Sequence, residues 1–314
     1  MRVVELSGGV GGAKLAEGLA AHLGADLTVV VNTGDDLELY GLAVWPDHDT
    51  VAYTLAGLDD EVRGWGLRDE TWTVMDRLAT LGEDTWFRLG DRDLATHVWR
   101  SERLRAGARP TEVALGLRTA MGLAPTILPM ADEPVRTEVR TDDGWLEFQE
   151  YFVHRHQAPT VHEVRFRGIE AARPTPEVLA ALDAADAIVI APSNPIVSIG
   201  PLLALGGLPE ALGAARARGV PVVAMSGIVG GVALKGPADR MLASLGHESS
   251  ALGVAILYRA VATAFIVDAV DAAAVPAIEA LGLRAIAFDT IMSDDAARAR
   301  VAGEVLAFAA SAAR

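Results

Sequence analysis

The residues best placed to do chemistry follow a short apolar segment near the N-terminus. The run SGGVGGAK, residues 7–14, lies between apolar residues 2–6 and a segment whose leucines have helical spacing. The backbone amides of a glycine loop and the N-terminus of the following helix form a natural site for phosphate. We therefore predict a phosphate site, with a tight structural turn as the alternative. Its residues are Gly8, Gly9, Gly11, Gly12 and Lys14.

Two familiar nucleotide motifs do not fit this loop. A Walker P-loop has glycine before its lysine and Ser or Thr after it, whereas Ala13 and Leu15 flank Lys14. The dinucleotide fingerprint requires another glycine three residues after Gly11, which is missing. An NAD-dependent oxidoreductase with Asp35 or Asp36 on the ribose is therefore disfavoured.

Lysine usage points to a second residue of the same kind. Lys14 and Lys235 are the lysines among 27 basic residues, and each closely follows a Gly-Gly pair. A compact ammonium beside free backbone amides suits phosphate, so we predict that Lys235 also binds phosphate. A composition biased toward arginine is the alternative explanation.

Two acidic motifs follow a predicted strand at residues 27–31. They are NTGDD at residues 32–36 and PDHDT at residues 46–50. Clustered carboxylates repel one another, which raises their pKa values or requires a cation, and hard oxygen ligands suit Mg²⁺. The predicted metal ligands are Asp35, Asp36, Asp47 and Asp49. As an alternative, Asp49 or Thr50 caps a helix that begins near Val51.

Two further segments could contact a ligand. WFRLGDRDLATH, residues 86–97, combines aromatic and charged residues before a predicted helix, as a site for a flat aromatic ligand would, although such charges are usually solvated. SNPIVSIGP, residues 193–201, follows the strongest predicted strand, where ligands bind in doubly wound folds. We predict ligand hydrogen bonds from Ser193, Asn194 and Ser198. His154, His156 and His162 are interpreted as surface or core residues.

The elements that position these residues form an α/β pattern. Short apolar strands predicted at residues 2–6, 27–31, 187–191, 220–224 and 263–267 lack polar alternation, as strands buried on both faces of a parallel sheet do. A helix is predicted over residues 13–23. The pattern indicates a doubly wound, mostly parallel sheet covered by helices.

A different pattern separates the second strand from the third. Residues 50–122 are mostly helical in spacing, with Trp72, Met75, Leu78 and Leu81 on one predicted buried face. Residues 126–168 include β-like pieces at 145–153 and 163–167, with a turn at 142–144. We therefore expect a core of residues 1–49 and 170–314 and an inserted helical and β-rich subdomain of residues 50–169. A helix over residues 294–313 should dock on the core.

Composition excludes several classes of protein. The 314 residues are 51% apolar and contain no cysteine, which excludes disulfides, zinc–thiolate sites and cysteine nucleophiles. A net charge of −15 disfavours broad nucleic-acid or anionic-membrane surfaces. Without a signal-like or membrane-spanning apolar run, we expect a cytoplasmic protein.

Seven ordered blocks resemble the 2-phospho-L-lactate transferase family of coenzyme F420 biosynthesis over essentially the whole chain. They are SGGVGGAK, NTGDDLELYGLAVWPDHDT, RGWGLRDETW, WFRLGDRDLATH, FQEYFV, APSNPIVSIGP and SGIVGGVALKGPAD. The resemblance implies a Rossmann-like fold, commonly a homodimer. It also implies magnesium-dependent transfer of a phospholactyl or phosphoenolpyruvyl group from a guanylylated donor to the terminal hydroxyl of 7,8-didemethyl-8-hydroxy-5-deazariboflavin, releasing GMP. Where relatives often have SPIVGG, this chain has SGIVGG.

The resemblance also implies roles for particular residues. It places deazaflavin contacts at Asp49 and in residues 88–92, including Arg88 and Arg92. The scarce aromatic residues add Trp86 as a candidate for the same ring. Asp36 and Asp49 are the catalytic candidates for accepting the hydroxyl proton, a role that competes with metal binding. The rival function is a non-enzymatic regulator of related fold that binds nucleotide sugars, and the acceptor and acidic motifs argue against it.

Overall fold

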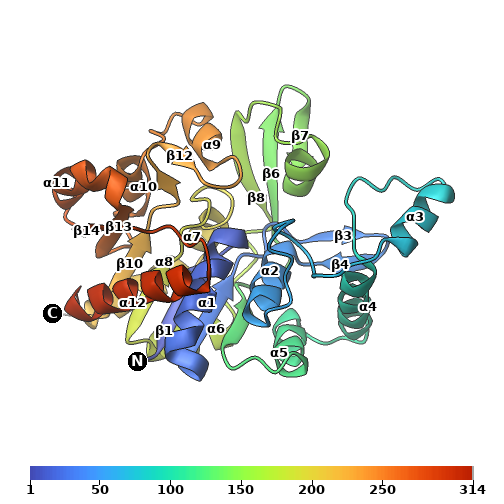
Figure 1. The fold of residues 1–314 in the computed structure, drawn as a ribbon, viewed down its shortest axis with the longest axis horizontal. Helices are drawn as coiled ribbons and strands as arrows, with labels where there is room; N and C mark the ends of the chain where they lie inside the picture. Colours follow the sequence, from blue (N-terminus) through green and yellow to red (C-terminus); the bar gives the residue numbers. More distant parts are fainter. Residues whose placement is uncertain (313–314) are drawn as a thin grey trace.

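A computed structural model describes residues 1–312 of this chain. Its centre is a seven-stranded sheet in the order β14-β13-β10-β9-β1-β2-β5, in which every neighbouring pair is parallel (Figure 1). The doubly wound α/β prediction is confirmed. The strands are β1 (Val3–Ser7), β2 (Leu27–Val31), β5 (Thr126–Pro129), β9 (Ala187–Ile190), β10 (Val222–Met225), β13 (Ala264–Asp268) and β14 (Arg284–Phe288).

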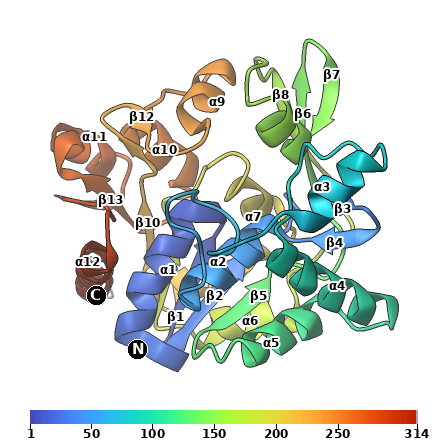
Figure 2. The ribbon, with the colours of Figure 1, turned by 45° about the vertical axis from the view of Figure 1, so that its right-hand side comes forward.

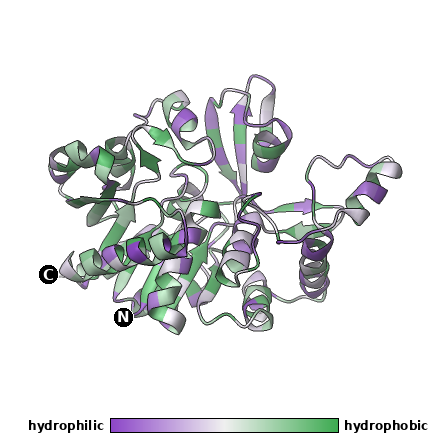
Figure 3. Ribbon diagram, viewed as in Figure 1, coloured by the Kyte–Doolittle hydropathy of each residue, from purple (hydrophilic) through white to green (hydrophobic). Residues whose placement is uncertain are grey.

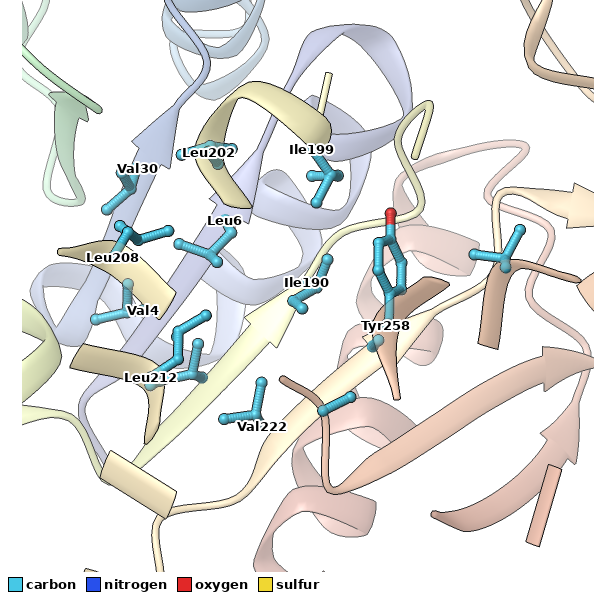
Figure 4. Close-up of a cluster of buried hydrophobic side chains, with 14 of the residues drawn as sticks. Val4, Leu6, Val30, Ile190, Ile199, Leu202, Leu208, Leu212, Val222 and Tyr258 are labelled. Carbon is cyan, nitrogen blue, oxygen red and sulfur yellow. The ribbon is translucent and has the colours of Figure 1, made fainter. Parts of the chain in front are cut away.

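Helices cover both faces of the sheet, so its strands are apolar on both sides. On one face lie α1 (Gly9–Leu23), α2 (Pro46–Leu55) and α12 (Asp295–Ala312) (Figure 2). The other face packs against α6 (Pro176–Ala184), α7 (Gly200–Ala204), α8 (Leu208–Ala217) and α10 (Ala251–Tyr258). Figure 4 shows side chains of this second layer, including Leu202, Leu212 and Tyr258, around Val4 and Leu6 of β1. The hydropathy colours follow this arrangement, with the central strands mainly apolar (Figure 3).

The remaining elements surround this core. Two short antiparallel hairpins and a three-stranded antiparallel sheet, in the order β7-β6-β8, project from it. These strands are β3 (Leu37–Leu39), β4 (Leu42–Val44), β6 (Arg136–Thr141), β7 (Gly144–Glu147), β8 (Glu163–Arg167), β11 (Ile228–Val229) and β12 (Val232–Ala233). The other helices are η1 (Gly24–Asp26), α3 (Thr73–Thr80), α4 (Asp91–Arg105), α5 (Pro110–Ala120), η2 (Glu150–His154), α9 (Ala238–Ser244), η3 (Ala269–Ala274) and α11 (Val275–Glu279). Within residues 1–312, no helix combines the length and apolar character needed to cross a membrane.

The order of the strands marks the place where a ligand is expected. From β1 the chain proceeds outward through β2 and β5, and it later returns beside β1 with β9 and continues outward in the opposite direction. The carboxyl ends of β1 and β9 are therefore the point at which the winding reverses, and ligands of doubly wound sheets bind in the crevice there. Both the glycine loop and the SNP segment begin at this point.

Several boundaries differ from the sequence predictions. The first helix begins at Gly9 rather than at residue 13, so most of the predicted loop is the first turn of α1. The second begins at Pro46 rather than near Val51, because proline is favoured at the first helical position and places both aspartates of PDHDT in the first turn. The predicted strand at residues 145–153 ends at Glu147 and continues as a helix through η2.

The expected insertion also differs in detail. Thr126–Pro129, placed by the sequence in the insertion, forms the edge strand β5 of the central sheet beside β2. The core therefore extends into residues 50–169. In α3 the predicted apolar face buries Met75 fully, but Leu81 is 65% exposed and Trp72 precedes the helix. The docking of α12 is confirmed, with Val301, Val305 and Phe308 buried; residue 313 of the predicted helix lies outside the described residues.

Candidate functional site

The glycine loop packs tightly against the segment that follows β9. The Gly8 N–H donates to Ser193 Oγ at 3.3 Å, and that hydroxyl donates to the Gly8 carbonyl at 2.5 Å. A Cβ on Gly8 would lie 2.7 Å from Ser198 Cβ, and a Cβ on Gly11 would clash with the Pro192 carbonyl. Close approach of the two segments therefore requires glycine at these two positions. Phosphate binding by these glycines stays a prediction.

Asp47 lies at the N-terminus of α1. Its carboxylate accepts a hydrogen bond from Asn32 Nδ2 at 3.0 Å, and a Cβ on Gly9 would lie 3.3 Å from its Oδ1. The positive end of the helix dipole favours an anion at this position. The turn after β2 thus joins the glycine loop through a carboxylate of α2, which brings the acidic motifs and the glycine loop together at the carboxyl edge of the sheet.

Asp35, Asp36 and Asp47 form a buried acidic group, each less than a tenth exposed. Burial raises the pKa of Asp35 well above its ordinary value, and the charge of Asp47 raises it further. Burial also raises the pKa of Asp36, although Arg136 and Arg100 oppose the rise. The pKa of Asp47 rises to about 6, again through burial. These carboxyls are therefore poised to take up a proton or a cation.

This acidic group fits a divalent cation. Among residues 1–312, Asp35 Oδ1 and Asp36 Oδ1 are buried oxygens without a hydrogen-bond partner. A buried carboxylate oxygen is costly without a donor or a cation, and Mg²⁺ prefers carboxylate oxygens as ligands. The donor set therefore suits Mg²⁺ better than a metal that prefers imidazole or sulfur.

The fourth predicted ligand, Asp49, has different partners. The Arg100 guanidinium contacts its Oδ1, His48 Nδ1 lies 3.5 Å from the same oxygen, and His97 Nδ1 lies 3.7 Å from Oδ2. Burial alone would raise the pKa of Asp49, but Arg100 and the two histidines hold it well below its usual range. Asp49 is thus a compensated anion, unlike the other three aspartates.

Helix α4 supplies most of the network around Asp49. Arg100, with no exposed surface, also donates to His97 Nδ1 at 3.0 Å, and Tyr53 donates to Asp93 Oδ1 at 2.6 Å. Ligand atoms of Asp49, Asp93 and His97 lie within 4.8 Å of one another. The positive charge of Arg100 against Asp49 and His97 makes this set less favourable for a cation than the acidic group.

The two lysines converge on one cavity of about 200 Å³ between α1, α2, α12 and the loop of residues 57–69. Lys14 donates to the Met292 carbonyl at 3.1 Å. Burial lowers the pKa of Lys14, and the charges of Arg298 and Lys235, which line the same cavity, lower it further. Lys235 lies against this loop, because a Cβ on Gly64 would be 2.8 Å from its Nζ.

Arg298 of α12 closes one side of this cavity. It pairs with Glu17 of α1, with Glu61 at 2.6 Å and with Asp295 at 3.2 Å. Its charge is therefore already balanced. Lys14 and Lys235 are the other cations among the described residues that line the cavity, and Asp59 and Glu61 line it as well. Trp65, 45% exposed, also lines the cavity.

The predicted deazaflavin contacts lie around α3 and the start of α4. Trp86 stacks on His154 with ring centroids 5.1 Å apart and planes 9° from parallel. Arg88 pairs with Asp76 at 2.8 Å and lies over the Trp72 ring. Arg92, in the first turn of α4, donates to the Arg68 carbonyl at 3.1 Å. These side chains belong to the same helical region as Asp93 and Arg100.

In the segment after β9, two predicted side chains serve the backbone. Ser193 joins Gly8, as described, and Asn194 Oδ1 accepts the Ile196 N–H at 2.9 Å. Ser198 lies beside Gly8, where its Cβ excludes any larger residue at that position. These contacts shape the crevice at the carboxyl ends of β1 and β9.

Sequence reasoning missed the arginines of the site. Arg100 lies beside Asp49, Arg136 beside Asp36, and Arg298 beside Glu61 in the lysine cavity, and each of these pairs is distant in sequence. A signal existed for Arg100, since Asp93, His97 and Arg100 recur at spacings of four and three residues on one helical face. No comparable signal marks Arg136 or Arg298.

Comparisons with known proteins identify the family and the fold. A family model described as 2-phospho-L-lactate transferase CofD matches residues 3–302. The phosphoenolpyruvate transferase of Kitasatospora aureofaciens is 44% identical over 317 residues, covering 98% of each chain. The 2-phospho-L-lactate transferase of Methanosarcina acetivorans is 40% identical over 292 residues, covering 93% of this chain and 94% of that protein. A solved Bacillus halodurans structure shares the fold, with a TM-score of 0.62 at 15% identity over 97% of this chain and 99% of that one.

Proposed function

The chain belongs to the 2-phospho-L-lactate transferase CofD family, and we propose that it transfers a phospholactyl or phosphoenolpyruvyl group from a guanylylated donor to the terminal hydroxyl of 7,8-didemethyl-8-hydroxy-5-deazariboflavin, releasing GMP. Relatives carrying either transferase name match more than nine-tenths of the chain, which supports an enzyme rather than a nucleotide-sugar regulator. An assay with both donors decides whether the phospholactyl or the phosphoenolpyruvyl group is transferred.

One observation carries the proposal most directly. Three buried carboxylates, two with unpartnered oxygens, lie at the carboxyl edge of the sheet beside the glycine loop. Phosphoryl-type transfer requires positioning and charge neutralisation more than covalent help from the protein. An acidic group that can hold a cation, together with a cavity lined by two lysines, would supply both signs of charge for that task.

The residues divide the work as follows. Asp35 and Asp47, whose charges interact, would hold Mg²⁺, which would neutralise charge on the donor diphosphate. Lys14 and Lys235 would bind the guanylyl phosphates. The deazaflavin hydroxyl attacks the phosphorus that bears the three-carbon acid, the new O–P bond forms, and the P–O bond to GMP breaks. Asp36, whose raised pKa makes it a better base than an ordinary aspartate, would take the hydroxyl proton.

The acceptor side is proposed from α3 and α4. Trp86, Arg88 and Arg92 would cover the deazaflavin ring, and Asp49 would contact it with its carboxylate fixed by Arg100. The segment with Ser193, Asn194 and Ser198 would border the nucleotide. We also propose a cytoplasmic homodimer, which light scattering of the purified protein and cell fractionation would test.

The experiment that tests the function uses the purified full chain with Mg²⁺ and the deazaflavin acceptor. Each guanylylated donor is supplied in a separate reaction, and GMP and the deazaflavin product are quantified by chromatography and mass spectrometry. We expect GMP and the acceptor-linked product in equal amounts with at least one donor. GMP without acceptor-linked product, or no reaction with either donor, would contradict the proposal.

A further inference from the structure

The strand β6 holds an arginine against the acidic group. The Thr137 N–H donates to the Gly34 carbonyl at 2.6 Å, which joins the start of β6 to the turn between Asn32 and Asp36. A Cβ on Gly34 would lie 2.5 Å from Thr137 Oγ1, so the two segments are in close contact. The residue before Thr137 is Arg136, and its position beside the acidic turn is therefore fixed by the backbone.

Arg136 lines a small pocket together with Asp35 and Asp36. Its guanidinium donates to the Val135 carbonyl at 2.8 Å, and within residues 1–312 it forms no ion pair. Arg136 is thus a cation at the acidic group whose hydrogen-bonding capacity is mostly unused by the protein.

The neighbouring charges of the three-stranded sheet are already paired. Arg165 and Arg167 donate to Glu138 at 2.6 and 2.8 Å, and Glu147, which also lines the pocket, lies 3.5 Å from Arg167. Arg140, on the same strand, pairs with Glu163 at 3.0 Å. Among these arginines, Arg136 is the one that a ligand anion would meet without displacing a carboxylate of the protein.

The charges at the carboxyl edge of the sheet follow a definite order. The lysine cavity includes Lys14 and Thr50 of α2, the acidic group includes Asp47 three residues earlier in α2, and Arg136 lines a second pocket with Asp35 and Asp36. The order is cation, acid, cation. The proposed donor has a matching order, since its guanylyl phosphates precede the reacting phosphorus and its three-carbon acid ends in a carboxylate.

We propose that Arg136 binds the carboxylate of the donor's three-carbon acid, a role that rests on the proposed function and specifies its donor site. A guanidinium presents paired N–H groups that match the two oxygens of a carboxylate. This contact would anchor the far end of the donor while the lysines hold the phosphates. It selects donors that carry a carboxylate and does not separate phospholactyl from phosphoenolpyruvyl donors, because both have one.

The test compares Arg136→Gln with wild type on two donors. One is the active guanylylated donor, and the other is the same molecule with a methyl group in place of the carboxylate. We expect kcat/KM for the carboxylate donor to fall about 30-fold in Arg136→Gln, as the loss of a charge-assisted contact predicts, and to change less than about threefold for the methyl analogue. The kcat/KM of Arg136→Lys for the carboxylate donor should lie between those of wild type and Arg136→Gln, because lysine keeps the charge but lacks the paired N–H groups. The KM for deazaflavin should stay at the wild-type value.

Arg140→Gln is the matched control, since it removes an arginine from the same strand that pairs with an exposed glutamate. The kcat/KM of Arg140→Gln should equal that of wild type for both donors. An equal fall of kcat/KM for both donors in Arg136→Gln, or no fall for either, would overturn the proposal. Urea unfolding of each variant identifies a folding defect. Calorimetric titration with the carboxylate donor and no acceptor gives a binding readout independent of turnover. Failure of the wild type to react with any donor would instead refute the proposed function.

Discussion

Replacing Arg100 with methionine should destabilise the protein through the charge that it leaves behind. Arg100 has no exposed surface, and its guanidinium contacts Asp49, donates to His97 Nδ1 at 3.0 Å and to the Ala43 carbonyl at 3.2 Å, and lies 4.3 Å from the Trp45 ring centroid. Methionine retains much of the apolar contact but no charge. Breaking a buried ion pair by removing one partner costs about 3–5 kcal/mol, and we expect a loss in this range at pH 8.

The pH dependence distinguishes this mechanism from simple loss of packing. In the wild type the pKa of Asp49 is lowered, so its contribution to stability is complete above the unfolded value and is lost as the pH falls toward the folded value. In Arg100→Met the effect of burial prevails and raises the pKa of Asp49, so the folded variant binds a proton more readily than the unfolded chain. The loss in free energy of unfolding caused by Arg100→Met should therefore be largest at pH 8 and become smaller toward pH 5.

The assay is urea unfolding of wild type, Arg100→Met, Asp49→Asn and the double variant at both pH values. The double variant should lose less than the sum of the single losses, because Asn leaves no charge to compensate. Arg103→Met is the control, since Arg103 is a half-exposed arginine of the same helix that pairs with Glu102. A deficit below about 1 kcal/mol at pH 8, or one that does not change with pH, would refute the reasoning.

Three other predictions follow from single side chains. Glu5→Met should raise the free energy of unfolding, more at pH 8 than at pH 5, because burial raises the pKa of Glu5 and its charged form is the costly one; urea unfolding showing no gain at pH 8 would contradict this. Lys14→Ala should weaken binding of the guanylylated donor at least about tenfold and deazaflavin binding much less, as calorimetry would show; equal weakening would place the loop away from the phosphates. Trp86→Ala and Arg88→Ala should each raise the KM for deazaflavin with little change in the KM for the donor, and an unchanged acceptor KM in both would place the ring elsewhere.

The sheet and the acidic edge could be predicted because local patterns specify them. Strands such as β2 and β13 are mostly apolar and lack polar alternation, a pattern that indicates a parallel sheet buried on both faces. Asp35 and Asp36 follow β2 directly, so their place at the carboxyl edge follows from the strand alone. The shared glycine setting of Lys14 and Lys235 predicts a phosphate-binding role for each lysine, but it does not predict that both line one cavity, as the structure shows.

The rest depended on contacts that sequence spacing does not reveal. Whether Asp49 joins a cation site or an ion pair depends on Arg100, which lies 51 residues away on α4. Thr126–Pro129 was assigned to the insertion because its short apolar run gives no sign that it pairs with β2. The predicted strand at residues 145–153 ends at Glu147, and Phe148 and Tyr151 of the helical segment that follows are buried in the same cluster as Leu146 of β7.

Asp36→Asn tests most directly whether the buried acidic group is required for group transfer. This change keeps the size of the side chain and removes its capacity to accept a proton. In a single turnover with donor, Mg²⁺ and deazaflavin, we expect the rate of GMP release to fall at least about 100-fold, with the affinity for donor and the urea unfolding midpoint close to wild type. A rate of transfer within about threefold of wild type would contradict the account.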